Sequence, residues 1–326
     1  MHTLYPLKFV PILKQKVWGG QGFFALFQKG SGSDLPWGES WELSGVPENV
    51  SVVQNGFLKG NNLADLLEVY MGDLVGEKVF ATYGSRFPLL VKLIDTREPL
   101  SVQVHPDDAM AIRKHGYSGK SEMWYVIHAE PGAEIFAGFN RDMEKEDLVR
   151  RLEEGSLREV LNVEKAVAGD VFYIPSGRIH AIGAGITLCE IQQSSDITYR
   201  IYDWDRTDAG GQARELHTAL ALEALDYKRC PEVKTQYEIR DGGSTPLVAS
   251  PHFTTNLLTI GQKTGVDHFY LDSFVVYVCL EGALSIDYGE GKLRVGKGET
   301  VLMPAEIKTL ELLPEGACRI LETYIA

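Results

Sequence analysis

The chain has 326 residues, of which 44% are apolar and 24% charged, as in an ordinary globular protein long enough for two domains. Acidic residues outnumber basic ones by 45 to 32, so the formal net charge is −13. Nucleic acids and anionic membranes require a basic face, so we expect neither as a partner. An anionic substrate would need a local cluster of lysine or arginine.

The cysteines and the N-terminus bear on the compartment. The four cysteines are scattered and form no Cys-X-X-Cys pair, so we interpret them as reduced thiols. The first twenty residues lack an uncharged apolar core of signal-peptide length, and no run of about 18 apolar residues occurs. We therefore expect a soluble cytoplasmic protein, whose oligomeric state the sequence does not give.

Short runs rich in β-branched and aromatic residues, separated by Gly, Pro, Asn and Asp, predict a mainly β protein with a few attached helices. The first helix is expected over residues 61–76, where apolar residues recur at helical spacing and Asn61 or Asn62 offers a cap. The strand "FPLLVKLID" follows, with Lys92 at its centre. Such a lysine must meet an anion or reach solvent at a barrel rim.

The stretch "LSVQVHPDD" at residues 100–108 places Gln103 and His105 two positions apart, so on a strand they point to one face. The next strand opens at Glu122 in "GKSEMWYVI", and Lys120 shares its face if the chain is extended there. If that face lines a barrel interior, these side chains meet in a cavity.

Residues 142–162 predict a charged helical pair broken at Gly155. The following stretch, "AGDVFYIPSGRIHAI", has the form Gly-Asp, four residues, Pro175, four residues, His180. It brings a second histidine far along the chain from His105.

A weak internal repeat relates this region to the C-terminal part. "KGETVLMPAEIKTLE" has the same Gly-acid and proline spacing, with Thr309 where His180 would fall. "FVVYVC" can be laid on "EMWYVI" so that Tyr277 matches Tyr125, which puts Phe274 at the place of Glu122.

The repeat predicts two related β-units, of which the first keeps ligand-type residues. We expect an N-terminal metal-binding catalytic domain over residues 1–238, including both helical segments. A C-terminal domain over residues 239–326 would lack the metal ligands. The predicted architecture is a double barrel, that is, two β-barrel or jelly-roll units with attached helices.

Gln103, His105, Glu122 and His180 are the candidate metal ligands. Two imidazoles, a carboxylate and an amide oxygen suit a divalent transition ion, with Zn²⁺ preferred and a remaining position for water or substrate. A lone strand histidine is more often an ordinary hydrogen-bonded or surface residue, and we interpret four others so: His115, His128, His217 and His252.

The run "SSDITYRIYDWDR" alternates at period two and presents Arg200 on the face opposite Tyr199. A charged edge strand that blocks aggregation is one interpretation, although Arg206 fits it better than Arg200. An anion-binding arginine is the other. The residues alone predict a metal-binding β-barrel with an anion pocket and leave the reaction open.

Several stretches, taken together, resemble type I mannose-6-phosphate isomerases of the short bacterial form. They are "VWGG", "WGESWELS", "QVHPDD", "GKSEMWYVI", "GDVFYIPSGRIHAI" and "DITYRIYDWDR", and they occur in the family's order. The C-terminal third agrees more loosely, as a ligand-free cupin copy would. The resemblance implies a zinc-dependent, cytoplasmic double-cupin enzyme that interconverts mannose 6-phosphate and fructose 6-phosphate.

The resemblance also implies roles for single residues. The family's metal ligands fall on the same four residues named above. Its other active-site positions fall on Arg200 (catalytic arginine), Lys120 and Lys92 (active-site lysines) and Asp196 (a further acid). The chain departs from the family in two ways: it has no room for the extra helical domain of long-type members, and Ser121 stands in "GKSE" where "GKTE" is common.

The implied reaction moves a proton between neighbouring carbons through an enediol whose negative charge must be stabilised, by the metal and by Arg200. His105, Lys120 or a metal-bound water could be the general base. The phosphate is expected at Lys92 or Lys120 and at hydroxyls such as that of Ser101. Two alternatives stay open: another metal-dependent cupin enzyme, such as an oxygen-activating iron enzyme, and a non-catalytic hexose-phosphate-binding cupin.

Overall fold

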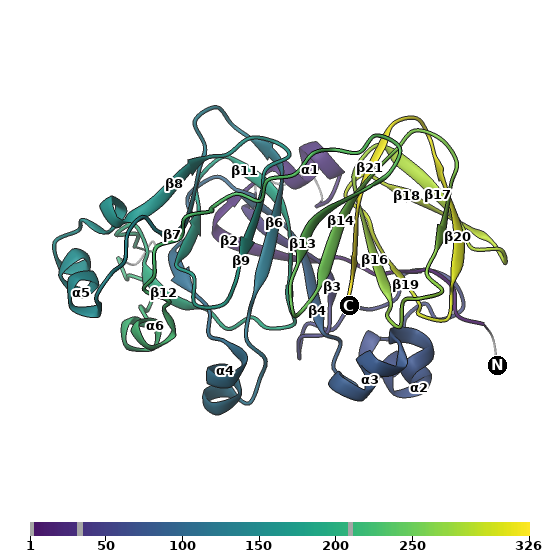
Figure 1. The fold of residues 1–326 in the computed structure, drawn as a ribbon, viewed down its shortest axis with the longest axis horizontal. Helices are drawn as coiled ribbons and strands as arrows, with labels where there is room; N and C mark the ends of the chain where they lie inside the picture. Colours follow the sequence, from purple (N-terminus) through teal and green to yellow (C-terminus); the bar gives the residue numbers. More distant parts are fainter. Residues whose placement is uncertain (1–2, 31–34, 208–210) are drawn as a thin grey trace. The chain divides into compact units, whose positions relative to one another are not determined.

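The computed structural model describes residues 3–30, 35–207 and 211–326, and within these ranges the chain is mainly β with attached helices, as predicted (Figure 1). It divides into two compact units, neither of which is continuous in sequence. Unit 1 consists of Met1–Ile12, Ser40–Val91 and Gln236–Ala326. Unit 2 consists of Leu13–Glu39 and Lys92–Thr235.

Two sheets contribute to unit 2. The first has the order β12-β5-β10-β7-β8. Its strands are β5 (Val102–Val104), β7 (Glu134–Phe139), β8 (Leu161–Lys165), β10 (His180–Ile182) and β12 (Tyr199–Tyr202). The second has the order β2-β3-β4-β11-β6-β9. Its strands are β2 (Ile12–Gly20), β3 (Trp37–Ser44), β4 (Leu89–Thr96), β6 (Glu122–Ala129), β9 (Val171–Ile174) and β11 (Ile186–Gln193). Along the chain, β2, β3 and β4 cross from one unit to the other.

Unit 1 repeats this two-sheet pattern. One sheet has the order β1-β19-β16-β21-β14-β13. Its strands are β1 (Leu7–Lys8), β13 (Ser244–Ala249), β14 (Thr254–Ile260), β16 (Val275–Glu281), β19 (Thr300–Met303) and β21 (Cys318–Tyr324). The other has the order β15-β20-β17-β18. Its strands are β15 (Thr264–Asp267), β17 (Ala283–Asp287), β18 (Lys292–Gly296) and β20 (Thr309–Pro314).

The helix predicted over residues 61–76 is confirmed as α2 (Leu63–Val75), and its cap is Asn62, whose side chain accepts a hydrogen bond from the Asp65 N–H. Met71 lies inside α2 with a φ of 42°, so the helix is kinked there. The short helix α3 (Glu77–Tyr83) follows. Both lie in unit 1, side by side in Figure 1.

The prediction of a helical pair over residues 142–162 is half wrong. Its first half is α5 (Lys145–Glu153), and Gly155 takes a φ of 68° just after it. Its second half is a single 3₁₀ turn, η1 (Leu157–Val160), because the chain enters β8 at Leu161. Four helices of the described residues were not predicted: α3 and, in unit 2, α1 (Gly22–Phe27), α4 (Asp108–His115) and α6 (Thr218–Ala224).

Both units contain the same two-sheet pattern, so the structure confirms the internal repeat. The predicted alignment of β16 with β6, however, is shifted by one residue. Each of the two strands has one residue whose N–H and carbonyl both form backbone hydrogen bonds with the Gly-acid turn of its own unit. This residue is Val126 in β6 and Cys279 in β16. Counting back from these two, the residue at the place of Glu122 is Val275 and not Phe274. The apolar run "FVVYVC" offers no polar landmark that would fix the register from sequence.

The other half of the repeat agrees with the prediction. His180 is the first residue of β10 and Thr309 the first residue of β20. His180 is paired with Gln103 of β5, and Thr309 with Asp267 of β15. Asp267 therefore matches Gln103 in register, but Asp267 and Thr309 are exposed, whereas their neighbours Val266 and Leu310 pack in the apolar core of unit 1.

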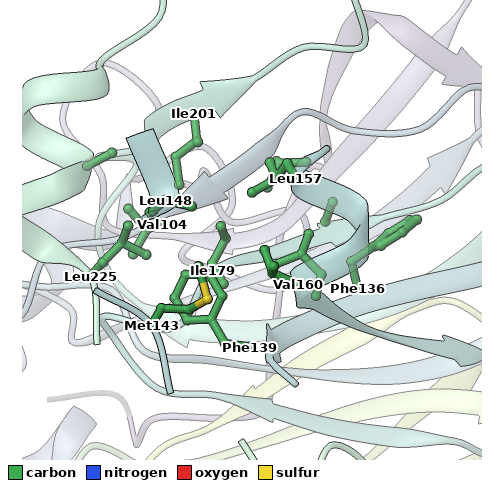
Figure 2. Close-up of a cluster of buried hydrophobic side chains, with 14 of the residues drawn as sticks. Val104, Phe136, Phe139, Met143, Leu148, Leu157, Val160, Ile179, Ile201 and Leu225 are labelled. Carbon is green, nitrogen blue, oxygen red and sulfur yellow. The ribbon is translucent and has the colours of Figure 1, made fainter. Parts of the chain in front are cut away.

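An apolar cluster packs on one face of the sheet β12-β5-β10-β7-β8 (Figure 2). Val104 and Ile179 belong to it, and they are the sequence neighbours of His105 and His180. Since successive strand residues point to opposite faces, this packing turns the polar neighbours to the other face. The helix α5 contributes the fully buried Leu148 to the same cluster.

We expect Leu148→Ala to lower the free energy of unfolding by about 2–5 kcal/mol, because it leaves a cavity in this cluster. Chemical denaturation measures the change. The matched control is Ile112→Ala on α4, where the side chain is 62% exposed and the cost should stay within about 0.5 kcal/mol. Equal costs for the two variants would contradict the packing described.

Candidate metal centre

Three buried side chains converge from different parts of unit 2. His105 directly follows β5, Glu122 opens β6 and His180 opens β10. Their ligand-type atoms all lie within 4.8 Å of one another. The Nε2 atoms of His105 and His180 lie 3.4 Å and 3.3 Å from the two carboxylate oxygens of Glu122.

The outer nitrogen of each ring fixes its tautomer. His105 Nδ1 lies 2.9 Å from the Ile197 carbonyl oxygen, and His180 Nδ1 lies 2.8 Å from that of Arg178. A carbonyl can only accept, so each Nδ1 carries the proton and each Nε2 presents a lone pair. Burial, assisted by the charge of Lys120, lowers the pKa of His105 to about 3. Burial also lowers the pKa of His180, so both rings are neutral.

The carboxylate of Glu122 is ionised. Burial would raise its pKa, but the ammonium of Lys120 and the ring of His105 outweigh burial and hold the pKa well below its usual value. Both carboxylate oxygens and Nε2 of His180 are buried without a hydrogen-bond partner. Unpaired lone pairs that face one another in a buried site are costly unless a cation lies between them. Two imidazole nitrogens and a carboxylate are a donor set that fits a divalent transition ion.

Gln103 faces the same side as this group. It is paired across the sheet with His180 on one neighbouring strand and with Arg200 on the other. Directly opposed residues of antiparallel strands share a face, so the half-buried amide of Gln103 lies on the histidine side of the sheet. Its role as a fourth ligand stays a prediction.

Lys120 lies within the group. Its Nζ is 3.1 Å from His105 Nε2 and 3.2 Å from a Glu122 oxygen. The preceding Gly119 approaches the start of α4 so closely that a Cβ there would lie 2.6 Å from the Asp108 nitrogen. Its N–H donates to the Asp108 carboxylate at 2.7 Å. The glycine of "GKSE" therefore lets the loop bring the lysine into the site.

Lys92 does not reach solvent. Its side chain is buried in the barrel, where Nζ lies 2.9 Å from Glu190 and 2.6 Å from Gln192. Burial would lower the pKa of Lys92, but the carboxylate of Glu190 outweighs burial and raises it. Gln192 is paired with Glu122 across β11 and β6, so this network borders the carboxylate of the candidate metal centre.

Sequence reasoning missed Glu190 and Gln192, although a signal was present. They stand two apart in "ITLCEIQQ", the same alternation that identified Gln103 and His105. Glu190 also accepts a hydrogen bond from the Trp124 indole at 2.9 Å. In this chain, two polar residues two positions apart in an apolar strand thus mark the candidate site twice.

The remaining predicted site residues lie in the same unit. Arg200 is half-buried; its Nη1 donates to the Glu215 carbonyl at 2.8 Å, and its Nε is buried without a partner. Ser101 is buried, whereas Asp196 is exposed. Their catalytic and substrate-binding roles stay predictions.

Two arginines that were assigned no site role surround one carboxylate beyond β12. Asp203 accepts hydrogen bonds from Arg206 at 2.7 Å and from Arg214 at 2.7 Å. Glu98 approaches Arg206 at 3.6 Å from an exposed position, yet Nε and Nη1 of Arg206 are buried without a hydrogen-bond partner. Burial lowers the pKa of Arg200, and the neighbouring charge of Arg214 lowers it further.

Two compositional expectations can be compared with the structure. All four cysteines are free, as predicted, and the structure places all four in buried positions. Across the described ranges, no helix combines the length and the apolar character needed to cross a membrane.

We expect His180→Ala to lose stoichiometric divalent metal, because it removes one of two imidazole donors from the group. Elemental analysis of the purified protein measures this. His128→Ala, which removes an exposed histidine of the same unit, is the control and should keep the metal. Equal metal content in both variants would disprove the site.

Comparisons with known proteins place the chain in a family. The family model "Phosphomannose isomerase type I, catalytic domain" matches residues 6–123. The chain is 36% identical to Mannose-6-phosphate isomerase ManA of Bacillus subtilis over 322 residues, 97% of this chain and 98% of that protein. It is 37% identical to Mannose-6-phosphate isomerase of Streptococcus mutans over 93% of this chain and 94% of that protein. The crystal structure of the Bacillus subtilis mannose 6-phosphate isomerase matches with a TM-score of 0.85 at 33% identity, covering 98% of this chain and 99% of that one. These full-length matches agree with the predicted double-cupin fold, and the chain is an isomerase that belongs to the type I phosphomannose isomerase family.

Proposed function

We propose that this chain interconverts mannose 6-phosphate and fructose 6-phosphate through an enediol, with Zn²⁺ as its metal. The names of its relatives support mannose 6-phosphate as a substrate, and fructose 6-phosphate is the ketose isomer of that aldose. The observation that carries the proposal is the buried meeting of the two Nε2 atoms with the carboxylate of Glu122, which accepts no hydrogen bond and is paired with Lys120 at 3.2 Å. Zn²⁺ suits nitrogen and oxygen donors, and this isomerisation needs no redox change in the metal.

His105, Glu122 and His180 would hold the ion, with Gln103 on the same face as a fourth donor. When bound, the ion would polarise the substrate oxygens and stabilise the negative charge of the enediol. Hydrogen bonds from Nδ1 of His105 and His180 to the carbonyls of Ile197 and Arg178 hold both imidazoles with Nε2 towards the metal position.

Lys120 is our choice for the residue that moves the proton. The reaction removes a proton from the carbon next to the carbonyl and returns it to the neighbouring carbon. His105 has both nitrogens engaged, Nδ1 with the Ile197 carbonyl and Nε2 towards the metal group. Lys120 lies within 3.2 Å of that group and is held by its loop. As the neutral amine it would be positioned to accept the proton, and as the resulting ammonium to return it.

Arg200 of β12 and Arg206 just beyond it suit the anionic end of the substrate. The unpartnered Nε atoms of Arg200 and Arg206 are donors aimed at no group of the described protein, and a phosphate would satisfy them. Arg200 would also offset negative charge on the enediol. Lys92 is already paired with Glu190, so we propose that it holds Glu190 and Gln192 beside the site. Ser101 and Asp196 stay proposed substrate contacts.

The setting we propose is cytoplasmic, which the free, buried cysteines support. The net charge of −13 supports the expectation that neither nucleic acid nor an anionic membrane is a partner.

Chelation should abolish the isomerase rate in a coupled assay that follows mannose 6-phosphate conversion, and Zn²⁺ should restore it. Add-back of single metals tests the choice of ion. Hexose phosphate binding without any conversion by the metal-loaded protein would favour the non-catalytic alternative. Iron-dependent oxygen uptake would favour the oxygen-activating one.

Arg200→Ala should keep the metal but lower kcat by about 10²–10³-fold, since it removes one positioned donor for developing charge. Arg113→Ala is the control, because that guanidinium is exposed on α4 and paired with Glu223. A near-normal kcat for Arg200→Ala would remove Arg200 from the mechanism.

A further inference from the structure

The strand β12, which carries Arg200, stands at the end of the sheet order β12-β5-β10-β7-β8. It is paired with β5 through Tyr199, Arg200 and Tyr202. The register shifts between Arg200 and Tyr202, so a β-bulge lies directly after the arginine. Because an edge strand with a bulge has few ladder hydrogen bonds, the backbone of Arg200 needs support from outside the sheet.

That support comes from His217, the residue just before α6. Its backbone N–H donates to the Arg200 carbonyl at 2.7 Å. Its ring accepts a hydrogen bond at Nδ1 from the Arg200 N–H at 3.1 Å. Since Nδ1 accepts, it carries no proton, and the proton of the neutral ring is on Nε2. The backbone and the side chain of His217 thus act, at this one point, as a neighbouring strand would.

These two bonds determine how Arg200 faces the candidate metal centre. The N–H and C=O of a strand residue point to the same side, so both groups of Arg200 point towards His217 and away from β5. Arg200 and Gln103 are then a pair without backbone hydrogen bonds between them, and side chains approach most closely in such pairs. Gln103 is in turn paired with His180. The bonds to His217 therefore hold the arginine next to the side of the sheet that carries the candidate ligands.

The guanidinium of Arg200 is held by the same segment. Its Nη1 donates to the Glu215 carbonyl at 2.8 Å. With the backbone bound by His217 and Nη1 bound by Glu215, a side chain that otherwise has many rotamers is restrained at both ends. Among the described residues, its buried Nε has no hydrogen-bond partner. The restraint therefore leaves one fixed donor for a ligand.

The segment 214–217 is itself anchored on both sides. At its start, Arg214 Nε donates to the Asp203 carboxylate at 2.7 Å. At its end α6 begins, and the buried Ala221 of α6 packs in the apolar cluster shown in Figure 2. These anchors keep His217 at the edge of β12.

We propose that His217 is a positioning residue for Arg200. Its Nδ1 fixes the arginine backbone at the edge of the sheet and thereby directs the guanidinium to the candidate metal centre. His217 acts through Arg200 and not on the substrate. The inference rests on the proposed function, in which Arg200 offsets negative charge on the enediol and binds the phosphate.

Two variants of His217 separate this role from a general loss of structure. His217→Ala removes the acceptor for the Arg200 N–H and keeps the backbone bond to the Arg200 carbonyl. His217→Asn restores an acceptor, because the side-chain oxygen of asparagine stands at the same place along the side chain as Nδ1. Leu216→Ala is the control, since it alters a 46% exposed neighbour in the same segment.

In the coupled isomerase assay with zinc-loaded, full-length protein, His217→Ala should lower kcat about tenfold and keep its metal. His217→Asn should recover most of that loss, and Leu216→Ala should have the kcat of the unaltered chain. In a protein that already carries Arg200→Ala, His217→Ala should have no further effect, because residues that act as one unit are not additive. Equal losses in both backgrounds would overturn the inference. So would a normal kcat for His217→Ala when Arg200→Ala is impaired.

A second measurement does not depend on turnover. Isotopic labelling of the arginine nitrogens gives an NMR resonance for the Arg200 Nε–H, identified by its loss in Arg200→Ala. We expect His217→Ala to speed the exchange of this hydrogen with solvent at least about fivefold, and His217→Asn to leave it near the original rate. Unchanged exchange in His217→Ala would overturn the positioning role. If exchange responds as expected while Arg200→Ala turns over normally, the role proposed for Arg200 in the reaction fails and its positioning by His217 stands.

Discussion

The buried carboxylate of Glu122 is the constraint around which the candidate catalytic centre is organised. Its two oxygens face the Nε2 lone pairs of His105 and His180 at 3.3–3.4 Å with no hydrogen between them. The ammonium of Lys120 offsets this arrangement of facing acceptors from one side, and a divalent cation between the acceptors would offset the rest. The surrounding structure maintains this arrangement. Backbone carbonyls accept hydrogen bonds from Nδ1 of both rings. The apolar cluster that contains Val104 and Ile179 holds the backbone beside His105 and His180 in place.

The two barrels show how one framework supports different chemistry. In each, three neighbouring strands of the larger sheet carry a row of interacting polar or aromatic side chains centred on a glutamate. In unit 2 the row joins Lys92, Glu190 and Trp124 and lies beside the metal ligands. In unit 1 the row joins Asn256, Glu322 and Tyr277, and Val275 and Thr309 stand at the positions that Glu122 and His180 take in unit 2.

Much of the candidate site could be predicted from sequence because strand alternation is a local property. Gln103 and His105 share a face for that reason alone, and the structure agrees. The meeting with Glu122 and His180 required long-range pairing, which the repeat and the family resemblance supplied. Where the signal was local but ambiguous, prediction failed. Because β16 is uniformly apolar, its predicted alignment with β6 was shifted by one residue. The charged stretch after Gly155 forms a 3₁₀ turn instead of an α-helix, because β8 begins at Leu161.

Other features could not be predicted because their partners are distant in sequence. Lys92 in the middle of an apolar strand was ambiguous until its pairing with Glu190, 98 positions away, was seen. The arginines around Asp203 gather through a turn in which Trp204 and Asp205 both have positive φ, a conformation that these residues seldom adopt. Neither arrangement leaves a periodic trace in the sequence.

The most direct measurement is anomalous diffraction at the zinc absorption edge from crystals of the purified, zinc-loaded protein. We expect a peak within about 2.0–2.2 Å of His105 Nε2, His180 Nε2 and a Glu122 oxygen. Zinc found elsewhere, with that group empty or filled by Lys120 alone, would contradict the assignment of the catalytic centre.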